Sequence, residues 1–229
     1  MKFLETHSEK LSEETHWEKA AKTRMGKYLT QLETDFIFNS IDPSKSHVVV
    51  DIGAEAGRFS LMAAGTSARV IGIDIDSYSL KRLKLKDENV SVIQADARKI
   101  PLKNETFDAV FMIEVLDYIP ELADTFGECC RILKPGSPLV LSFGNQSSLK
   151  SKLRELRGKS YLHSYKRVMQ CLSKTGFTVK KKMGYSWLPF GRTSESQLVP
   201  FLAGAEWLFR LRRIPSLSPW VIIHAAKSV

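Results

Sequence analysis

Short apolar runs alternate with stretches suited to helices from residue 48 to residue 142, and this alternation limits the folds open to the chain. The apolar runs cover residues 48–52, 70–74, 90–93, 109–113 and 139–142. The helix-compatible stretches cover 58–64, 77–86 and 122–133, and Lys134-Pro135-Gly136 ends the last of them. Continuous apolar runs are typical of parallel strands that are buried on both faces. We therefore predict a doubly wound α/β sheet with helices on its faces.

The segments outside this core carry patterns of their own. Residues 9–41 place Trp17, Met25 and Tyr28 at helical spacing, which predicts an N-terminal helical cap over residues 1–44. After the core of residues 45–145, the region 146–229 is predicted to hold a helix over 165–175 and strands that start near 177 and 220. Between these strands lies an insertion of about residues 188–218, which is longer than an ordinary connection and has a helical pattern over 195–213.

Composition places the chain among ordinary globular proteins. Its 229 residues suit a single domain. The 3 cysteines, of which Cys129 and Cys130 are adjacent, cannot form a disulfide framework or a zinc knuckle, so we expect a reducing cytoplasm. No apolar run approaches the ~18 residues that span a bilayer, and the charged N-terminal segment is unlike a signal peptide. We also expect no metal site, since no His, Cys and Asp residues have ligand spacing.

Charge is divided unevenly along the chain. The net charge is +9, but residues 1–130 carry 16 Lys+Arg against 22 Asp+Glu, a balance of −6. Residues 131–229 carry 18 against 3, a balance of +15. Such asymmetry usually reports a partner or substrate, and it predicts an anionic substrate or an anionic surface on the basic side.

The first apolar run ends in a small-residue turn that leads directly into a predicted helix. This turn reads Asp51-Ile52-Gly53-Ala54-Glu55-Ala56-Gly57-Arg58, and its small residues let a ligand approach the backbone amides. A dinucleotide fingerprint that starts at Gly53 would need glycines where Glu55 and Arg58 stand. Asp51 and Glu55 would repel a pyrophosphate but would suit a ligand with an ammonium and a sulfonium. The turn therefore favours a cationic cofactor.

Two more carboxylates follow later apolar runs. Asp74 ends the second run, where an acidic side chain accepts hydrogen bonds from ribose hydroxyls, and Asp96 follows the third. In a doubly wound sheet the carboxyl ends of the strands line one crevice. We therefore expect Asp51, Gly53, Asp74 and Asp96 to converge on one ligand.

These segments together resemble the class I S-adenosylmethionine-dependent methyltransferases, in particular the type 11 group that includes ubiquinone and menaquinone biosynthesis enzymes. The resemblance covers about residues 45–145 and rests on VVVDIGAEAGRFS, VIGIDID, VIQADARKIPLKNETFDAVFMIEVLDYIP and RILKPGSPLVLSF. It implies a Rossmann-like seven-stranded sheet of order 3-2-1-4-5-7-6 with an antiparallel last strand. It also implies S-adenosyl-L-methionine as cofactor, S-adenosyl-L-homocysteine as product and a cofactor-binding core at 45–145. The basic charge of the C-terminal part predicts that residues 146–229, with the insertion, form the substrate side.

The resemblance also assigns residues to parts of the cofactor. It implies that the methionine end is held by Asp51, Gly53, Ala54 and Gly57. It implies Asp74 and Ile75 for ribose and adenine, Asp96 and Ala97 for the adenine amino group and ring, and Glu114 for the region near the sulfonium. The chain departs from the family pattern at two positions: Glu55 replaces the middle glycine of D-x-G-x-G-x-G, and Tyr118 stands where histidine is common.

Catalytic residues are harder to identify from the sequence. Methyl transfer from a sulfonium is an in-line displacement that needs a base only if the acceptor loses a proton. His163 and Tyr118 are the candidates, although a surface or helix-cap role for His163 is the interpretation we favour. We likewise expect Trp17, Met25 and Tyr28 to form the core of the cap rather than a lid over the cofactor.

The function predicted from sequence is methyl transfer to a small-molecule or lipid-linked acceptor, with an anionic one indicated by the basic half. An RNA methyltransferase and a non-catalytic cofactor-binding protein are the alternatives. The 188–218 insertion, with apolar residues followed by Arg210, Arg212 and Arg213, could form a lid, a peripheral membrane contact or a packed helix. The acceptor atom and the oligomeric state stay open.

Overall fold

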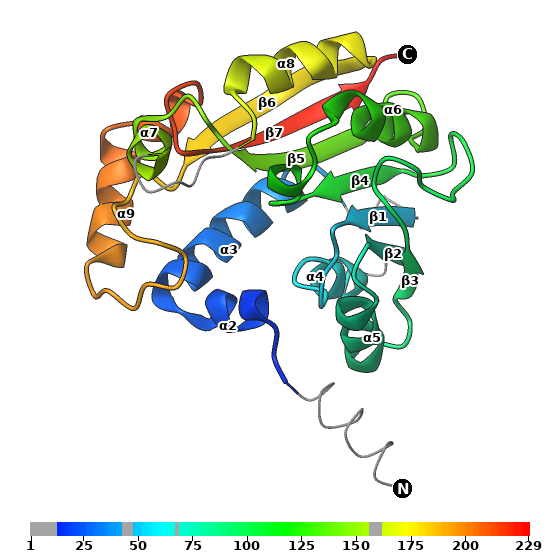
Figure 1. Ribbon diagram of the computed structural model, residues 1–229, viewed down its shortest axis with the longest axis horizontal. Helices are drawn as coiled ribbons and strands as arrows, with labels where there is room; N and C mark the ends of the chain where they lie inside the picture. The colour runs from blue at the N-terminus through cyan, green and yellow to red at the C-terminus, as the bar shows by residue number, and fades with distance from the viewer. Residues whose placement is uncertain (1–12, 43–47, 67–68, 156–161) are drawn as a thin grey trace, which may run out of the picture.

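Seven strands form one sheet in the order β3-β2-β1-β4-β5-β7-β6 (Figure 1). The computed structural model describes residues 13–42, 48–66, 69–155 and 162–229. The strands are β1 Val48–Ile52, β2 Arg69–Asp74, β3 Ser91–Gln94, β4 Ala109–Met112, β5 Pro138–Gly144, β6 Phe177–Tyr185 and β7 Trp220–Lys227. β1 to β5 pair in parallel, and β7 runs antiparallel to both of its neighbours, β5 and β6. The predicted order and the antiparallel last strand are therefore confirmed.

Helices cover both faces of the sheet. They are α2 His16–Lys22, α3 Arg24–Phe38, α4 Ser60–Ala64, α5 Ser77–Lys86, α6 Leu122–Ile132, α7 Leu149–Glu155, α8 Tyr165–Lys174 and α9 Val199–Leu208, with the 3₁₀ turns η1 Leu116–Tyr118 and η2 Leu211–Arg213. α6 and α8 bury residues such as Phe126 and Leu172 in one cluster, whereas α3 and α5 bury Phe36 and Leu83 in another. Consecutive strand residues alternate between the two clusters, so the strands are buried on both faces as predicted.

The N-terminal cap divides into two helices at Thr23. The Thr23 side chain accepts a hydrogen bond from the amide of Gly26 at 3.0 Å, which caps α3 where α2 ends. Thr15 and Glu18 form a capping box at the start of α2. Residues 1–12 and 43–44 of the predicted cap lie outside the described residues. One helix, α7, was not predicted, because its Leu149 and Leu153 form only a short apolar stripe, and both are exposed.

The predicted insertion also appears, between the end of β6 at Tyr185 and the start of β7 at Trp220. It contains α9 and η2. The helix predicted over 195–213 is shorter than expected: α9 covers 199–208, and Arg210, with a φ of 53°, separates it from the 3₁₀ turn η2. Among the described residues no helix is long and apolar enough to cross a membrane.

Candidate cofactor site

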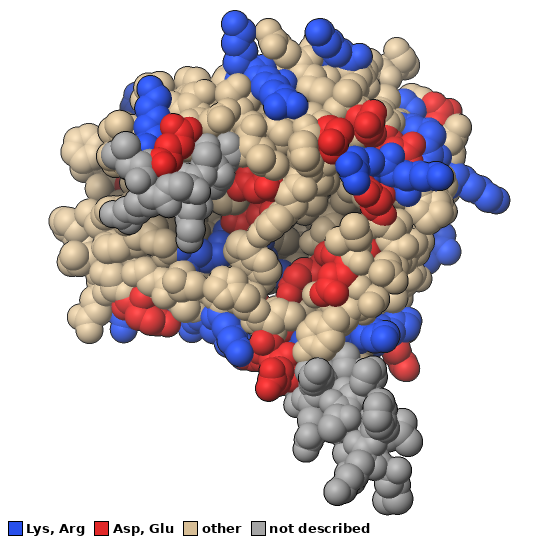
Figure 2. Space-filling model, viewed as in Figure 1, with Lys and Arg blue, Asp and Glu red and all other residues tan. Residues whose placement is uncertain are grey.

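A pocket of about 1040 Å³ opens at the carboxyl ends of β1 to β4. Its walls come from the loops after these strands and from α2, and Figure 2 shows the hollow with Asp and Glu side chains near it. The pocket lining includes each residue that the sequence assigned to the cofactor: Asp51, Gly53, Ala54, Gly57, Asp74, Ile75, Asp96, Ala97 and Glu114. The expected convergence of these segments is therefore present in the fold.

The loop after β1 keeps the path of a glycine-rich turn although one glycine is replaced. Gly53, Glu55 and Gly57 have φ values of 74°, 49° and 92°, all in the left-handed region that favours glycine. The Glu55 amide donates to Asp74 Oδ2 at 2.9 Å, and the Ala56 amide donates to Glu55 Oε2 at 2.5 Å. These bonds hold the strained residue in place, so the departure at Glu55 leaves the turn intact.

Steric contact explains why Gly53 itself has no substitute. A Cβ atom on Gly53 would lie 2.2 Å from Val115 Cγ2, in the loop that follows β4. Any side chain there would push apart the loops that form the floor of the pocket. The amides of Gly53 and Ala54 donate to the Ile73 carbonyl at 2.7 Å and 3.0 Å, which holds this close-packed turn against β2.

Asp51 is buried at the end of β1 and accepts a hydrogen bond from the Ser60 hydroxyl at 2.5 Å. Burial raises the pKa of Asp51 to about 7, although the bond from Ser60 and the charge of Arg58 act in the opposite direction. The carboxyl group is consequently poised between its neutral and charged forms near neutral pH. A cationic group beside it would favour the charged form.

Asp74 and Asp96 lie further along the same edge of the sheet. Asp74 Oδ1 accepts from the Asp76 amide at 2.9 Å, so both of its carboxylate oxygens are oriented by the backbone. The Arg98 side chain hydrogen-bonds Asp96 and, with the Arg98 amide, holds the pKa of Asp96 below its usual range. Ile75 is 70% exposed beside them and offers an apolar surface within the pocket.

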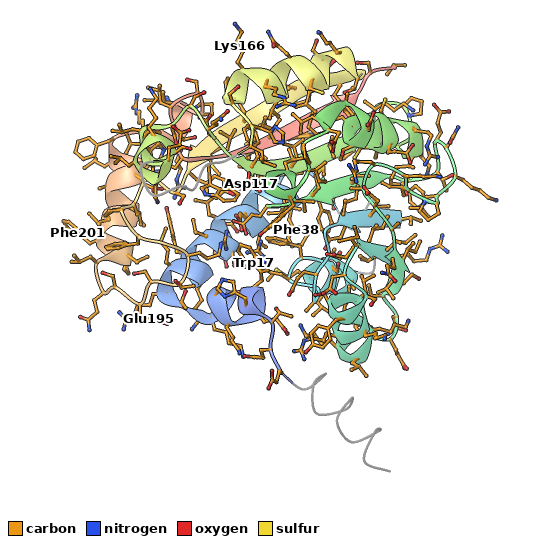
Figure 3. The ribbon with its side chains drawn as sticks, in the orientation of Figure 1. Trp17, Phe38, Asp117, Lys166, Glu195 and Phe201 are labelled. Carbon is orange, nitrogen blue, oxygen red and sulfur yellow. The ribbon has the colours of Figure 1, made fainter. Side chains whose placement is uncertain are left out.

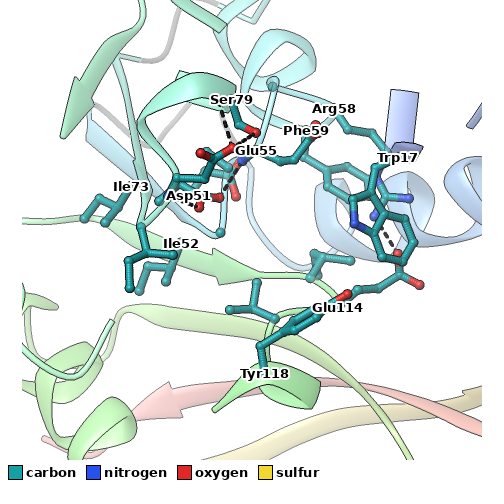
Figure 4. A pocket seen from close by; sticks show the side chains of 18 of the residues that line it. Trp17, Asp51, Ile52, Glu55, Arg58, Phe59, Ile73, Ser79, Glu114 and Tyr118 are labelled. Atoms are coloured by element: carbon teal, nitrogen blue, oxygen red, sulfur yellow. Dashed lines mark hydrogen bonds and ion pairs between the residues drawn. The ribbon is translucent and has the colours of Figure 1, made fainter. Parts of the chain in front are cut away.

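A buried cluster of two acids and two arginines closes the other side of the pocket; we call it the Glu33–Arg192 cluster. Arg58 Nη2 lies 2.9 Å from Glu114 Oε2, and Arg192 Nη2 donates to both Glu114 Oε1 and, at 3.0 Å, Glu33 Oε1. The hydroxyl of Tyr185 in β6 also donates to Glu33, at 2.8 Å. In Figure 4, Asp51 and Glu55 lie on one side of the pocket and Trp17, Arg58 and Glu114 on the other. The cluster therefore connects the N-terminal cap, the loop after β1 and the insertion.

The two acids of this cluster have opposite protonation behaviour. Burial opposes ionisation of Glu114, but the charges of Arg192 and Arg58 outweigh it and lower the pKa of Glu114. Burial and the negative charge of Glu114 together raise the pKa of Glu33. Sequence reasoning missed Glu33 and Arg192. An acid at position 33, on the apolar face of α3 beside Leu29 and Leu32, was the available signal.

Helix α2 forms a wall of the pocket that faces α5. Its Glu18 carboxylate receives Arg82 Nε and Nη2, each at 2.9 Å, and pairs with Lys86 at 2.6 Å. Burial would raise the pKa of Glu18, but these hydrogen bonds outweigh it and hold that pKa at about 2. Trp17, next to Glu18, lines the pocket, whereas Met25 is buried in the core. The core interpretation thus holds for Met25 and not for Trp17.

The two catalytic candidates have different positions. Tyr118 lines the pocket and is 69% exposed, and partial burial raises the pKa of its hydroxyl. His163 does not line the pocket; it is fully buried, and its Nε2 lies 2.7 Å from the carbonyl oxygen of Ile119, so Nε2 carries the proton. Burial lowers the pKa of His163.

Among the described residues no group of three or more His, Cys, Asp and Glu is arranged to hold a metal ion.

Comparison with known proteins extends these observations. A family model described as a methyltransferase domain matches residues 50–141. A curated relative, the malonyl-[acyl-carrier protein] O-methyltransferase of Methylococcus capsulatus, is 30% identical over 141 residues, which are 57% of this chain and 51% of the relative. The chain thus spans about half the length of this relative.

Two solved structures share the fold across most of the chain. An S-adenosylmethionine dependent methyltransferase from Mesorhizobium loti has a TM-score of 0.64 at 17% identity, and the match covers 84% of this chain and 96% of that one. The second is the geranyl diphosphate C-methyltransferase of Streptomyces coelicolor A3(2), in complex with Mg²⁺, geranyl diphosphate and S-adenosyl-L-homocysteine. It has a TM-score of 0.64 at 16% identity, and the match covers 88% of this chain and 81% of that one. Residues 50–141 thus match the methyltransferase domain family, and the strand order of the whole sheet is that of the S-adenosylmethionine-dependent methyltransferase fold.

Proposed function

We propose that this chain transfers a methyl group from S-adenosyl-L-methionine to a small-molecule or lipid-linked acceptor that carries negative charge. The observation that carries the proposal is the single pocket lined by all nine residues that the family pattern assigns to the cofactor. The curated relative acts on a malonyl-[acyl-carrier protein], and one structural neighbour holds a diphosphate. The basic balance of residues 131–229 suits an anionic acceptor of this kind.

The residues around the pocket fit this cofactor chemically. Asp74, with both oxygens oriented by backbone amides, is placed to accept hydrogen bonds from ribose hydroxyls. Ile75 supplies an apolar surface for the adenine ring, and Asp96 an acceptor for its amino group. Gly53 and Gly57 let the backbone approach the methionine end, where Asp51 would pair with an ammonium group.

In the proposed mechanism the protein mainly positions the two reactants. The cofactor supplies an electrophilic methyl group, and in-line displacement needs the acceptor atom held in near-attack geometry. Arg58 and Arg192 fix the Glu114 carboxylate at the end of β4, which gives this part of the pocket a defined shape. A tyrosine hydroxyl is protonated at neutral pH, and partial burial raises the pKa of Tyr118 further, so Tyr118 would serve as a hydrogen-bond donor and not as a base. An acceptor that is already a carboxylate or phosphate anion needs no base.

Calorimetry with S-adenosyl-L-methionine tests the cofactor part of the proposal. We expect Asp74→Asn to weaken binding about tenfold or more, since a charge-assisted hydrogen bond contributes about 1.5–3 kcal/mol. Asp124→Asn, which changes an exposed acid on α6, is the matched control and should bind like the wild type. The assignment is wrong if the wild-type protein does not bind, or if Asp74→Asn binds equally well.

Transfer of a labelled methyl group tests the catalytic part. Carboxylated acyl thioesters and polyprenyl phosphates are the acceptors to try first, with bulk tRNA as the test of the RNA alternative. Binding of the cofactor without transfer to any acceptor would favour the non-catalytic alternative. Tight tRNA binding that weakens steeply with salt would favour RNA.

A further inference from the structure

Helix α9 and the residues after it present large apolar side chains to the outside. We call this surface the α9 patch and define it by six residues. Their exposed fractions are 58% for Leu198, 77% for Phe201, 72% for Trp207, 68% for Leu208, 69% for Phe209 and 59% for Leu217. α9 lies at the outer left edge in Figure 1, and Figure 3 shows Phe201 pointing away from the rest of the molecule. None of the six residues lines the cofactor pocket.

The orientation of α9 is the reverse of that of an ordinary surface helix. Its one charged residue, Glu206, faces inward and is 1% exposed. Glu206 accepts hydrogen bonds from the Tyr28 hydroxyl at 2.8 Å and from the Trp187 amide at 2.7 Å. These contacts fix which side of α9 faces the protein, so the outward position of Phe201 and Trp207 is imposed by the fold.

Positive charge adjoins the patch. Arg210 and Arg213 follow α9, are exposed, and make no ion pair with the residues that the structure describes. Within the span 198–217 the one acidic residue is Glu206. Its carboxylate lies on the inner side of α9, where it accepts the hydrogen bond from Tyr28. Exposed aromatic and aliphatic side chains beside unpaired arginines have the composition of segments that lie at a membrane interface.

We propose that the α9 patch docks on the surface of a bilayer that contains anionic lipids. Phe201, Trp207 and Phe209 would enter the boundary between headgroups and acyl chains, and Arg210 and Arg213 would lie at the level of the phosphates. A second copy of the chain suits the patch less well. A two-fold contact would bring the same arginines, and the two basic halves, against each other. Docking does not depend on the proposed methyl transfer, and either can fail alone.

Co-sedimentation with vesicles tests the docking directly. The full chain is mixed with phosphatidylcholine vesicles that contain or lack phosphatidylglycerol, and the bound fraction is measured at low and high salt. We expect binding to the anionic vesicles. The triple variant Phe201→Ser/Trp207→Ser/Phe209→Ser should lower the partition coefficient about tenfold or more, because it removes most of the apolar area available for insertion. Leu85→Ser, at a residue 71% exposed on α5, is the matched control and should bind like the wild type.

Charge reversal tests the electrostatic part of the proposal. Arg210→Glu/Arg213→Glu should abolish the preference for anionic vesicles, whereas Lys166→Glu/Lys174→Glu, two exposed residues of α8, makes the same change in net charge and should preserve it. Equal losses in both double variants would mean that net charge alone acts, and would overturn the proposal. So would a failure of the wild-type protein to bind anionic vesicles. The proposal would also be wrong if light scattering shows a dimer of the wild-type protein, the triple variant is a monomer, and neither binds vesicles. The α9 patch would then be a contact between two copies of the chain.

Discussion

Asp51 illustrates how one residue can link stability to the cofactor site. Its neutral form is favoured in the folded chain, because burial raises its pKa from 3.8 to about 7. Between these two values the folded chain binds more protons than the unfolded chain, so the contribution of Asp51 to stability falls as pH rises through this range. Above about pH 7, in the protein without ligand, the buried Asp51 is ionised and its full destabilising effect on the free energy of unfolding is reached.

The first prediction concerns this pH dependence. Asp51→Asn cannot ionise, so its stability should exceed that of the wild type by an amount that grows on the order of 4 kcal/mol between about pH 4 and pH 8. Guanidinium unfolding at several pH values measures the difference between the two proteins, and groups common to both cancel. Asp124→Asn should follow the wild-type profile. Parallel profiles for wild type and Asp51→Asn would contradict the assigned pKa.

The Glu33–Arg192 cluster shows a second effect at the residue scale. Arg192 is nearly buried, and its removal would leave Glu33 and Glu114 with Arg58 as the remaining cationic partner that the structure describes. Breaking a buried pair by removing one partner typically costs about 3–5 kcal/mol, since the other charge stays buried. An exposed pair between the same two regions, Arg24 and Glu195, lies 3.9 Å apart and offers a comparison.

The second prediction follows from this contrast. Arg192→Met should lower the free energy of unfolding by about 3 kcal/mol, whereas Glu195→Gln should change it by less than about 1 kcal/mol. The double variant Glu33→Gln/Arg192→Met should lose less stability than the two single variants summed, because it leaves fewer unpaired charges. Denaturant titrations of the wild type, the two single variants and the double variant give the double-mutant cycle. Additive losses would show that the two residues act independently.

At the scale of elements, α2 is held over the pocket by one residue. Glu18 caps its own helix through Thr15 and reaches Arg82 and Lys86 on α5. Its pKa is lowered from 4.5 to about 2, so its stabilising contribution is complete above pH 4.5 and is lost as pH falls toward 2. At neutral pH the interaction holds Trp17, the neighbouring residue, against the pocket.

The third prediction is that Glu18→Gln loosens α2 without unfolding the sheet. Amide hydrogen exchange in α2 should accelerate by about tenfold or more, since neutral glutamine cannot pair with both cations. Affinity for S-adenosyl-L-methionine should fall with it, and exchange in β4 and β5 should not change. Glu13→Gln, an exposed acid just before α2, serves as control. Unchanged exchange in α2 would show that other contacts hold the helix.

Elements differ in how well the sequence predicts them. β1, β4 and α5 were predictable because periodicity and turn residues act locally, and their bounds agree to within about one residue. The division of the cap at Thr23 was harder to foresee, because it depends partly on a bond from the Thr23 hydroxyl to the Arg192 carbonyl, which is 169 positions away. The same holds for α9, whose inward face is fixed by Tyr28 and Trp187 rather than by its own pattern.

The site shows the same limit. Asp51, Asp74 and Asp96 could be placed from the sequence, because each ends or follows a strand and parallel strands share one edge. Glu33 and Arg192 could not be placed, because their pairing depends on how the cap and the insertion pack over the sheet. Local pattern does not encode that packing.

At the scale of the whole molecule, cofactor binding should raise the stability of the folded unit. The fourth prediction is that S-adenosyl-L-homocysteine at about one hundred times its Kd adds about 2.7 kcal/mol, a rise in Tm of roughly 5–10 °C for a chain of this size. Differential scanning fluorimetry measures the shift. Asp74→Asn should show a much smaller shift at the same ligand concentration. If the protein unfolds in two steps and the ligand raises the Tm of only one of them, residues 1–130 and 131–229 unfold separately.

The strand order also has a consequence for synthesis on the ribosome. β7 is made after the other six strands, yet it lies between β5 and β6 and supplies the ladder that attaches β6 to the sheet. A nascent chain therefore presents the open edge of β5, and β6 has no neighbour, until residues 220–227 have left the exit tunnel. Glu33 in turn waits for Tyr185 and Arg192, which are translated more than 150 codons later. Chains that stall or terminate early would thus carry an exposed strand edge and an unpaired acid, two features that chaperones and proteases can act on before a finished copy exists.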